Sequence, residues 1–269
     1  MKKNRRIVGK FFMLMAIIFF YLPIVYVVIF SFNGSKSLTA LKGFSLQWYE
    51  KMFRDTQMMQ SLYTTILVAV IATVVSTVAG TLTAVGLSKS KKIVRDLVSQ
   101  INDFPIMNPE IVTAIGLMLF FITFRIERGL LTMILAHIAF CIPYVILSVM
   151  PKIRSLDPNL ADAAMDLGAT PAQALWQVIV PQISPGILSG ALIAFTMSFD
   201  DFIISYFATG RGVKNLSLMV YTMSKRVNPS INAVSTLVVA VITIVLIVIN
   251  IVPYLMERSG RKKEHLSDQ

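Results

Sequence analysis

The sequence predicts an all-α membrane protein with six transmembrane helices. Hydrophobic residues make up 55% of its 269 residues and charged residues only 14%, and its mean hydropathy is +0.71. Soluble domains carry about 45–50% apolar and about 25% charged residues. Each of six apolar runs is long enough for a spanning helix, which needs about 20 residues, and the runs lack the period-two alternation of barrel strands. The six runs lie near 7–32, 61–87, 101–124, 129–150, 185–208 and 232–256.

The first run is expected to remain in the mature protein as a span. The basic stretch MKKNRRIVGK precedes it, as in a signal peptide, but the run is too long and no small-residue cleavage site follows. Lys and Arg gather in 1–10, 88–100 and 257–269. Because cytoplasmic segments carry an excess of Lys and Arg, both termini are predicted to be cytoplasmic, and the whole chain, 1–269, to form one transmembrane domain.

The net charge of +11 is explained by basic residues at the ends of apolar runs. We therefore expect the lipid bilayer, and no nucleic acid, as a partner. The single cysteine, Cys141, excludes an intrachain disulfide.

The second run carries small residues at a spacing of four. Ser76, Gly80 and Ala84 would lie on one face of a helix. Small residues at this spacing allow helices to approach closely in lipid, so we expect this face to pack against another span.

The predicted cytoplasmic loop 151–184 begins with signals for a short helix. Asp157 and Pro158 suit an N-cap and a first helical position. The helix is expected over 158–167, with Gly168 as the residue that ends it.

A second helix is expected directly after this glycine. Thr170, Pro171 and Gln173 suit a cap, a first-turn proline and a capping-box partner. That helix is expected to end before Pro181. The resulting helix–glycine–helix element could fit a groove on another protein or, by spacing alone, could simply connect two spans.

The sequence DAAMDLGATPAQALWQVIVP resembles the EAA loop of ABC-transporter permeases of the smaller importer class. The matching residues are Asp162, Ala163, Ala164, Gly168, Ala169, Trp176, Val180 and Pro181. Asp162 replaces the usual Glu, and Val180 the usual Leu. In that family the loop is a coupling helix docked in a cleft of the ATPase subunit, so the resemblance implies a small (type I) ABC importer permease fold. The coupling contacts are expected from Asp162, Ala163, Ala164, Asp166, Gly168 and Ala169.

The chain carries no ATPase motif of its own. It lacks a G-x-x-x-x-G-K-[ST] loop, since Gly9-Lys10 is followed by Phe11. We therefore expect a non-catalytic subunit without a cofactor, whose partner ATPase binds ATP and Mg. His137 and His265 are isolated, and no zinc-type spacing is present, so His137 is expected to be a packed or hydrogen-bonded histidine.

Two adjacent acids, Asp200 and Asp201, interrupt the fifth apolar run. A charge at the centre of a spanning helix costs about 2.5–3.5 kcal/mol, so the pair must face a protein interior or a wet path, unless it is solvated near the outer interface. On a continuous helix the two side chains would point about 100° apart. Asp201 shares a stripe with Ser198 and Ser205, so we expect Asp201 to be a supporting residue and Asp200 a substrate contact.

A third acid lies where prolines interrupt the third run. Asn108, Pro109 and Glu110 suit the cap, first and second positions of a restarted helix after Pro105. Glu110 would then be a helix-dipole partner, a carboxylate of the path, or both. The residues expected to line the substrate path are Asp200, Asp201, Glu110, Asn108, Ser198 and Tyr206.

Four stretches together resemble the second permease subunit of bacterial spermidine/putrescine importers. They are SFDDFIISYFATG, MNPEIVTAI, SFNGS and DAAMDLGAT. The resemblance implies a heterodimer with a second related permease, two ATPase subunits, an extracytoplasmic polyamine-binding protein and a place in the bacterial cytoplasmic membrane. Glu110 stands where the family commonly has Asp, which leaves the choice between putrescine and spermidine open.

Two other functions are compatible with parts of this pattern. A permease of the same class could carry another small substrate, although acids within the spans favour a cation over an anion. An ATP-independent channel or secondary transporter would give no reason for the helix–glycine–helix loop.

Overall fold

The computed structural model describes residues 2–37, 39–210, 212–224, 228–244 and 247. In this part of the chain the regular structure is helical apart from one isolated bridge between Asn33 and Phe44. The chain divides into two compact units, Gln57–Tyr221 and the combination of Met1–Thr56 with Thr222–Gln269. The predicted all-α class is confirmed, whereas a single transmembrane domain stays a prediction.

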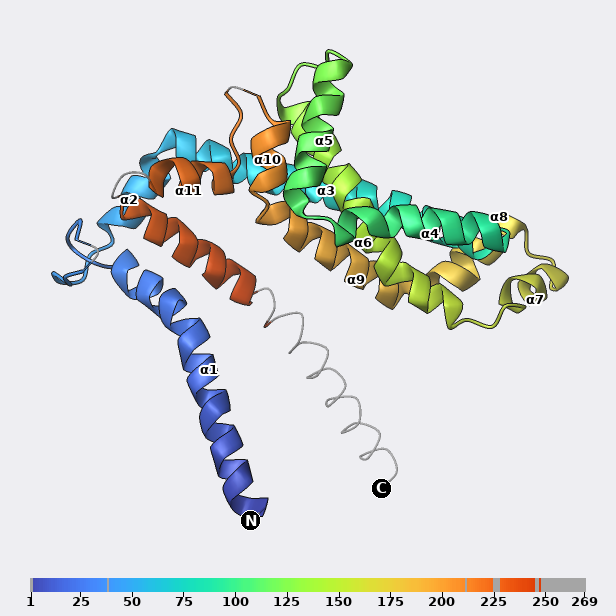
Figure 1. Ribbon diagram of the computed structural model, residues 1–269, viewed down its shortest axis with the longest axis horizontal. Coiled ribbons are helices and arrows are strands. Elements are labelled where there is room, and N and C mark those ends of the chain that lie inside the picture. The colour runs from blue at the N-terminus through green and yellow to red at the C-terminus, as the bar shows by residue number, and fades with distance from the viewer. Residues whose placement is uncertain (1, 38, 211, 225–227, 245–246, 248–269) are drawn as a thin grey trace, which may run out of the picture. The chain divides into compact units, whose positions relative to one another are not determined.

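The unit Gln57–Tyr221 is a stack of long helices joined by short helical segments (Figure 1). α6 packs against α9, and α10 packs against α5 and α6. The elements are α3 (Thr56–Ser88), α4 (Lys92–Met107), α5 (Glu110–Thr123), α6 (Leu130–Arg154), α7 (Leu160–Asp166), α8 (Pro171–Gln173), the π-helical turn η1 (Ala174–Ile179), α9 (Val180–Phe199), α10 (Ile203–Ala208) and α11 (Leu216–Ser224).

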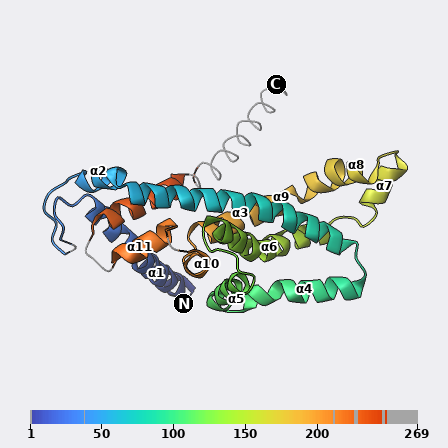
Figure 2. The same cartoon turned by 90° about the horizontal axis from the view of Figure 1, so that it is seen from above.

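Glycines on two helices allow α3 and α9 to approach α6. Ser76, Gly80 and Ala84 are all buried, as predicted. A Cβ on Gly80 would lie 2.7 Å from Cγ1 of Val145, and one on Gly190 would lie 3.2 Å from the Cα of the same valine. Small residues therefore make this close packing possible, and Figure 2 shows α3 running along α6 and α9.

Several helices are long and apolar enough to cross a membrane. They are Gly9–Ser31, Thr56–Ser88, Leu130–Arg154 and Pro171–Phe199, and the pair α4 and α5 adds one further span that is bent by 107°. The sixth predicted span, 232–256, begins within a helix over Ser230–Ile244, while 245–246 and 248–256 lie outside the described residues. The protein is a multi-pass membrane protein, and the predicted six spans are compatible with these helices.

The third span breaks one residue later than expected. Asn108 ends α4, and Pro109 rather than Asn108 is the N-cap of α5. The expected cap was wrong because Pro109 is itself extended, with a ψ of 132°, so the first helical residue is Glu110. Asn108 is extended as well, with a ψ of 150°, as is usual before proline. Its Nδ2 donates to the carbonyl of Phe104 at 2.9 Å.

The loop after α6 contains the predicted first helix in a shorter form. α7 begins after Asn159, because Asp157 Oδ1 accepts the backbone N–H of Asn159 at 2.9 Å and so forms a turn before the helix. Gly168 has the expected left-handed conformation, with φ of +92°. The helix therefore starts at Leu160 and not at Pro158.

The second helix of this loop does not end before Pro181, as predicted. The capping box is present, since Thr170 Oγ1 accepts from Gln173 N at 3.3 Å and Gln173 Oε1 accepts from Thr170 N at 2.8 Å. The helix then continues from Pro171 to Phe199. The π-helical turn η1 ends at Ile179, two residues before Pro181, and shifts the hydrogen-bond register, which accommodates a residue that has no N–H.

In the other unit, Asn33 of the SFNGS stretch organises the loop between α1 (Lys2–Ser31) and α2 (Gln47–Arg54). Its Nδ2 donates to the carbonyls of Ser37 and Ala40 at 2.9 Å each, and its Oδ1 accepts from Lys42 N at 2.8 Å. Its own carbonyl accepts the indole N–H of Trp48 at 2.6 Å. The SFNGS stretch therefore has a structural role, because its Asn33 holds this loop together.

Candidate functional site

The two adjacent aspartates lie in a break between two helices. α9 ends at Phe199, Asp200 is its C-cap, and α10 begins at Ile203. The expectation of one continuous helix over 185–208 was wrong. The Asp201 carboxylate instead accepts the backbone N–H groups of Ile204 at 3.0 Å and Ser205 at 2.7 Å, which stabilises a new helical start.

The Asp201 side chain is enclosed by hydrogen-bond donors. Only 4% of the residue is exposed. Its Oδ2 also accepts the hydroxyl of Ser205 at 2.7 Å and lies 3.2 Å from His137 Nε2, while its backbone carbonyl accepts Nδ2 of Asn215 at 2.9 Å. A buried carboxylate is tolerated when it is paired in this way, so Asp201 holds the break together.

His137 connects α6 to both sides of the break. Its Nδ1 lies 2.7 Å from Ser198 Oγ at the end of α9, and its Nε2 lies 3.0 Å from Ser205 Oγ on α10. The prediction of a hydrogen-bonded histidine is confirmed. Ser198, which we expected to line the path, is buried with its hydroxyl beside His137, and therefore supports the break.

Glu110 brings a third carboxylate to the same place. α5 packs against α10, and this packing brings the Glu110 carboxyl, on the first residue of α5, close to Asp201 and Asp200. Asp200 is exposed, and its carbonyl accepts the hydroxyl of Ser217 at 3.1 Å. Within the part of the chain that the structure describes, no Lys or Arg lies within 4.0 Å of these acids.

The other predicted path residue on this connection belongs to an aromatic group. Tyr206 is 52% exposed, and the centroid of its ring lies 5.7 Å from that of Phe202. The ring of Tyr221 on α11 also lies next to Phe202, with the two ring centroids 4.8 Å apart. Phe202 and Tyr221 were missed by the sequence analysis, although the position of Phe202 directly after two acids is a usable signal, because aromatic faces attract cations.

The remaining predicted path residue, Asn108, lies at the break between α4 and α5. Its amide is turned back to the α4 carbonyl described above. The two helix breaks therefore contribute differently, with Glu110 reaching the acids of the α9–α10 connection and Asn108 closing the end of its own helix.

The predicted coupling residues lie on and around α7. Asp162, Ala163, Asp166 and Gly168 are exposed, and Ala164 and Ala169 are partly buried. Two large apolar side chains nearby are also exposed, Leu167 at the end of α7 at 91% and Trp176 in η1 at 59%. Leu167 was missed, and its position beside the bend glycine is the only sequence signal for it. An exposed apolar side chain at a bend suits insertion into a partner.

Among the described residues, no group of three or more His, Cys, Asp and Glu side chains could hold a metal ion. His265 lies outside the described residues.

Solved structures of ABC transporters share this fold. The chain matches a bacterial ABC transporter involved in the import of the acidic polysaccharide alginate with a TM-score of 0.73 and 18% identity, over 94% of this chain and 96% of that one. The alginate ABC transporter in complex with an alginate-bound periplasmic protein matches with a TM-score of 0.67 and 15% identity. These likenesses confirm the predicted small ABC importer permease fold.

Curated relatives resemble the chain over nearly its whole length. The putrescine transport system permease protein PotI of Escherichia coli K12 is 35% identical over 264 residues, which cover 93% of this chain and 91% of the relative. The spermidine/putrescine transport system permease protein PotC of Haemophilus influenzae is 33% identical over 229 residues, covering 85% and 89%.

A family model also matches most of the chain. Residues 76–259 match the model of the binding-protein-dependent transport system inner membrane component, a range that contains the α7 loop and both helix breaks with their acids. The resemblance predicted from the sequence is confirmed, and the chain belongs to the family of binding-protein-dependent transport system inner membrane components.

Proposed function

We propose that the chain is the permease subunit of an ATP-driven importer that carries polyamines, putrescine or spermidine, into the cell. The single observation that carries this proposal is the meeting of Asp200, Asp201 and Glu110 at the breaks of two apolar helices. Broken helices with charged groups at membrane depth are typical of substrate sites in transporters. The names of the relatives point to the same substrates.

The three acids have different roles in this proposal. Asp201 is already occupied by His137, Ser205 and the backbone, so it adds negative potential but offers few free lone pairs. Asp200 is exposed and accepts an ammonium group directly, while Glu110 provides a further carboxyl group from α5. A charged hydrogen bond contributes about 1.5–3 kcal/mol, which is enough to replace part of the hydration of a protonated amine.

The aromatic group complements these acids. A protonated amine over an exposed aromatic face gains about 0.5–1 kcal/mol, and more where water is excluded. Tyr206 and Tyr221 are both about half exposed, and the rings of both lie next to that of Phe202. A polyamine has alternating ammonium groups and methylene stretches, so acids and aromatic rings in sequence suit it better than a compact metal cation.

The partners follow from the exposed coupling element. We propose that α7 and the residues after Gly168 dock on an ATPase subunit that binds ATP and Mg, and that this chain performs no catalysis and needs no cofactor. The complete importer would contain a second related permease, two ATPase subunits and an external polyamine-binding protein. It would lie in the bacterial cytoplasmic membrane with both termini of this chain inside.

Uptake by the reconstituted importer tests this proposal. Proteoliposomes containing the chain with its co-expressed subunits and binding protein should accumulate labelled putrescine or spermidine only when ATP is hydrolysed. Asp96→Asn, which neutralises an exposed acid on α4 away from the three acids, serves as the control for Asp200→Asn. ATP-dependent uptake that Asp200→Asn leaves unchanged, or no uptake of either polyamine by an importer that hydrolyses ATP, would contradict the assignment.

A further inference from the structure

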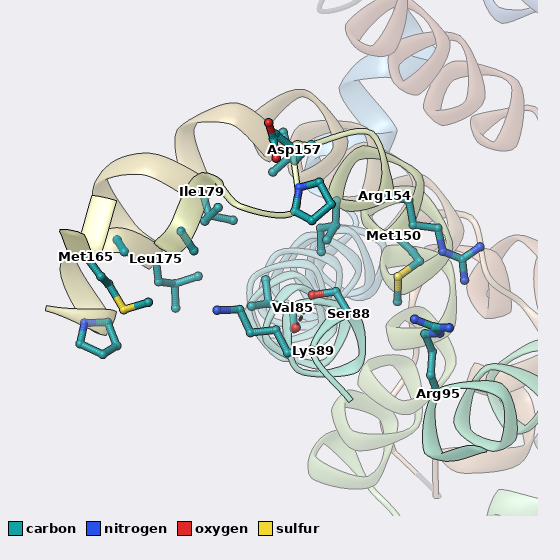
Figure 3. A pocket seen from close by; sticks show the side chains of 16 residues that line it. Val85, Ser88, Lys89, Arg95, Met150, Arg154, Asp157, Met165, Leu175 and Ile179 are labelled. Carbon is teal, nitrogen blue, oxygen red and sulfur yellow. Dashed lines mark hydrogen bonds between the residues drawn. The ribbon is translucent and has the colours of Figure 1, made fainter. Parts of the chain in front are cut away.

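A cavity of about 430 Å³ lies where the long helices meet the α7 loop (Figure 3). One part of its wall comes from the ends of α3 and α6, and another part from α7 and η1. The main apolar side chains of this wall are Val85, Met150, Ile153, Met165, Leu175 and Ile179. The cavity therefore connects the membrane spans to the element proposed to couple them to ATP hydrolysis.

Three cationic side chains also line the cavity. They are Lys89 after α3, Arg95 on α4 and Arg154 at the end of α6. Figure 3 shows Arg95 and Arg154 on the same side of the cavity as Met150, with Lys89 extending along it. Three cations from three different helix ends therefore surround one apolar space.

These cations are poorly compensated. Within the described residues, neither Lys89 nor Arg154 has a carboxylate within 4.0 Å, and the partner of Arg95 is Asp96 at 4.0 Å. The cavity also has one acid, Asp157, whose Oδ1 accepts the N–H of Asn159 and whose carboxylate points away from the arginines in Figure 3.

Helix ends alone do not explain this group of charges. A cation at the C-terminal end of a helix interacts favourably with the helix dipole. This accounts for Lys89, directly after α3, and for Arg154, in the last turn of α6. Arg95, however, lies in the first turn of α4 (Lys92–Met107), where the dipole disfavours a positive charge. Membrane topology explains why 88–100 is basic as a whole, but of the lysines and arginines at this helix start only Arg95 lines the cavity, together with Lys89 and Arg154, and this grouping points to an anion.

We propose that this cavity binds the phosphate head group of an anionic phospholipid, with the first part of the acyl chains against the apolar wall. Arginine pairs recognise phosphate through several parallel N–H donors, and basic pockets between spans on the cytoplasmic side bind anionic lipid head groups. A soluble phosphate compound would leave the apolar wall unused. A lipid in this place would touch α3, α6, α7 and η1 together and so hold the α7 loop against the spans.

Lipid binding to the full-length chain, purified with any co-purifying subunits, tests this site. The detergent-solubilised and delipidated protein is titrated with phosphatidylglycerol, with phosphatidylcholine and with glycerol 3-phosphate, and bound lipid is counted by native mass spectrometry. We compare Arg95→Gln/Arg154→Gln with the matched control Lys91→Gln/Lys152→Gln, which removes the same charge from neighbouring exposed positions outside the cavity. Arg95→Lys/Arg154→Lys keeps the charge.

We expect phosphatidylglycerol to bind at least fivefold more tightly than phosphatidylcholine, and this preference to be lost in Arg95→Gln/Arg154→Gln but kept in the control and largely in the lysine variant. Both arginines lie outside the buried core, so their removal should leave the melting temperature without lipid unchanged. The proposal would be overturned if all variants bound phosphatidylglycerol equally, or if neither the parent nor any variant bound it. Displacement of the lipid by glycerol 3-phosphate at similar concentrations would overturn it in favour of a soluble phosphate ligand.

Discussion

His137 Nε2 on α6 lies 3.2 Å from Asp201 Oδ2 in the connection between α9 and α10, and their side chains are 1% and 0% exposed. This contact fixes the place where a membrane-spanning helix is interrupted. It also separates two adjacent acids by function, because Asp201 is turned into the protein and Asp200 is left exposed. The buried pair is thus the support on which the proposed substrate site rests.

Removing the imidazole should destabilise the protein. His137→Phe keeps an aromatic ring but removes the imidazole nitrogen beside the Asp201 carboxylate, and the loss of a hydrogen bond to a charged group should cost about 1.5–3 kcal/mol. We expect a clear loss of melting temperature in detergent. His137→Gln, whose amide retains a donor, should recover part of it, and equal melting temperatures for the parent and His137→Phe would refute this role of the pair.

Neutralising the exposed acid should affect transport and not folding. Asp200→Asn removes a charged hydrogen bond worth about 1.5–3 kcal/mol, which corresponds to a loss of about tenfold or more in polyamine uptake. The membrane level should match the parent. Asp201→Asn should instead lower the melting temperature, because Asp201 accepts from two backbone N–H groups and a hydroxyl.

A reversed pattern, with Asp201→Asn stable but inactive and Asp200→Asn unstable, would show that the two roles are interchanged. A double variant that imports at the parental rate would show that both acids are merely solvated.

The exposed ring of Tyr206 should contribute to substrate affinity. Tyr206→Leu removes the aromatic face, and a loss of about 0.5–1 kcal/mol predicts an increase in the KM of uptake of about two- to fivefold with little change in maximal rate. Tyr206→Phe keeps the face and should behave like the parent. If Tyr206→Phe is as impaired as Tyr206→Leu, the hydroxyl and not the ring makes the contact.

The bend after α7 should require glycine. Gly168 has a φ of +92°, where a side chain costs about 1–2 kcal/mol. Gly168→Val should therefore leave the chain in the membrane but weaken its association with the ATPase and abolish ATP-dependent uptake. Gly86→Val is the matched control, because a Cβ there also meets no atom within 4 Å and the φ is not positive. Normal uptake by Gly168→Val would contradict the proposed coupling role.

The contact between α3 and α6 should respond to a pair of substitutions. Gly80→Ala places a Cβ 2.7 Å from Cγ1 of Val145, so the helices must separate, which we expect to cost about 1–3 kcal/mol. Val145→Ala removes the clashing methyl groups but keeps the Cβ of residue 145, which would lie 2.8 Å from the new Cβ, so combined with Gly80→Ala it should restore only part of the lost stability. Thermal unfolding of the two single variants and the double variant measures this coupling, and purely additive losses would argue against it.

The sequence alone determined the features that depend on neighbouring residues or on composition. Long apolar runs must become helices in lipid because each backbone group has to be satisfied within its own segment, so the all-α membrane class followed directly. The bend at Gly168 and the capping box of Thr170 and Gln173 were likewise predicted, since their partners lie within a few residues. The resemblance of the loop around Asp162 to a coupling element also needed no coordinates.

The tertiary structure decided where those helices stop and which side chains meet. The sequence around Asp200 and Asp201 allows a continuous helix, and the break arises because Asp201 is held by His137 from another helix as well as by the start of α10. Glu110 joins the same site only through the packing of α5 on α10, and Lys89, Arg95 and Arg154 surround one cavity only because three helix ends converge. Such long-range partners cannot be predicted from local sequence patterns, because a carboxylate or guanidinium pairs with whichever donor or acceptor the packed chain brings near it.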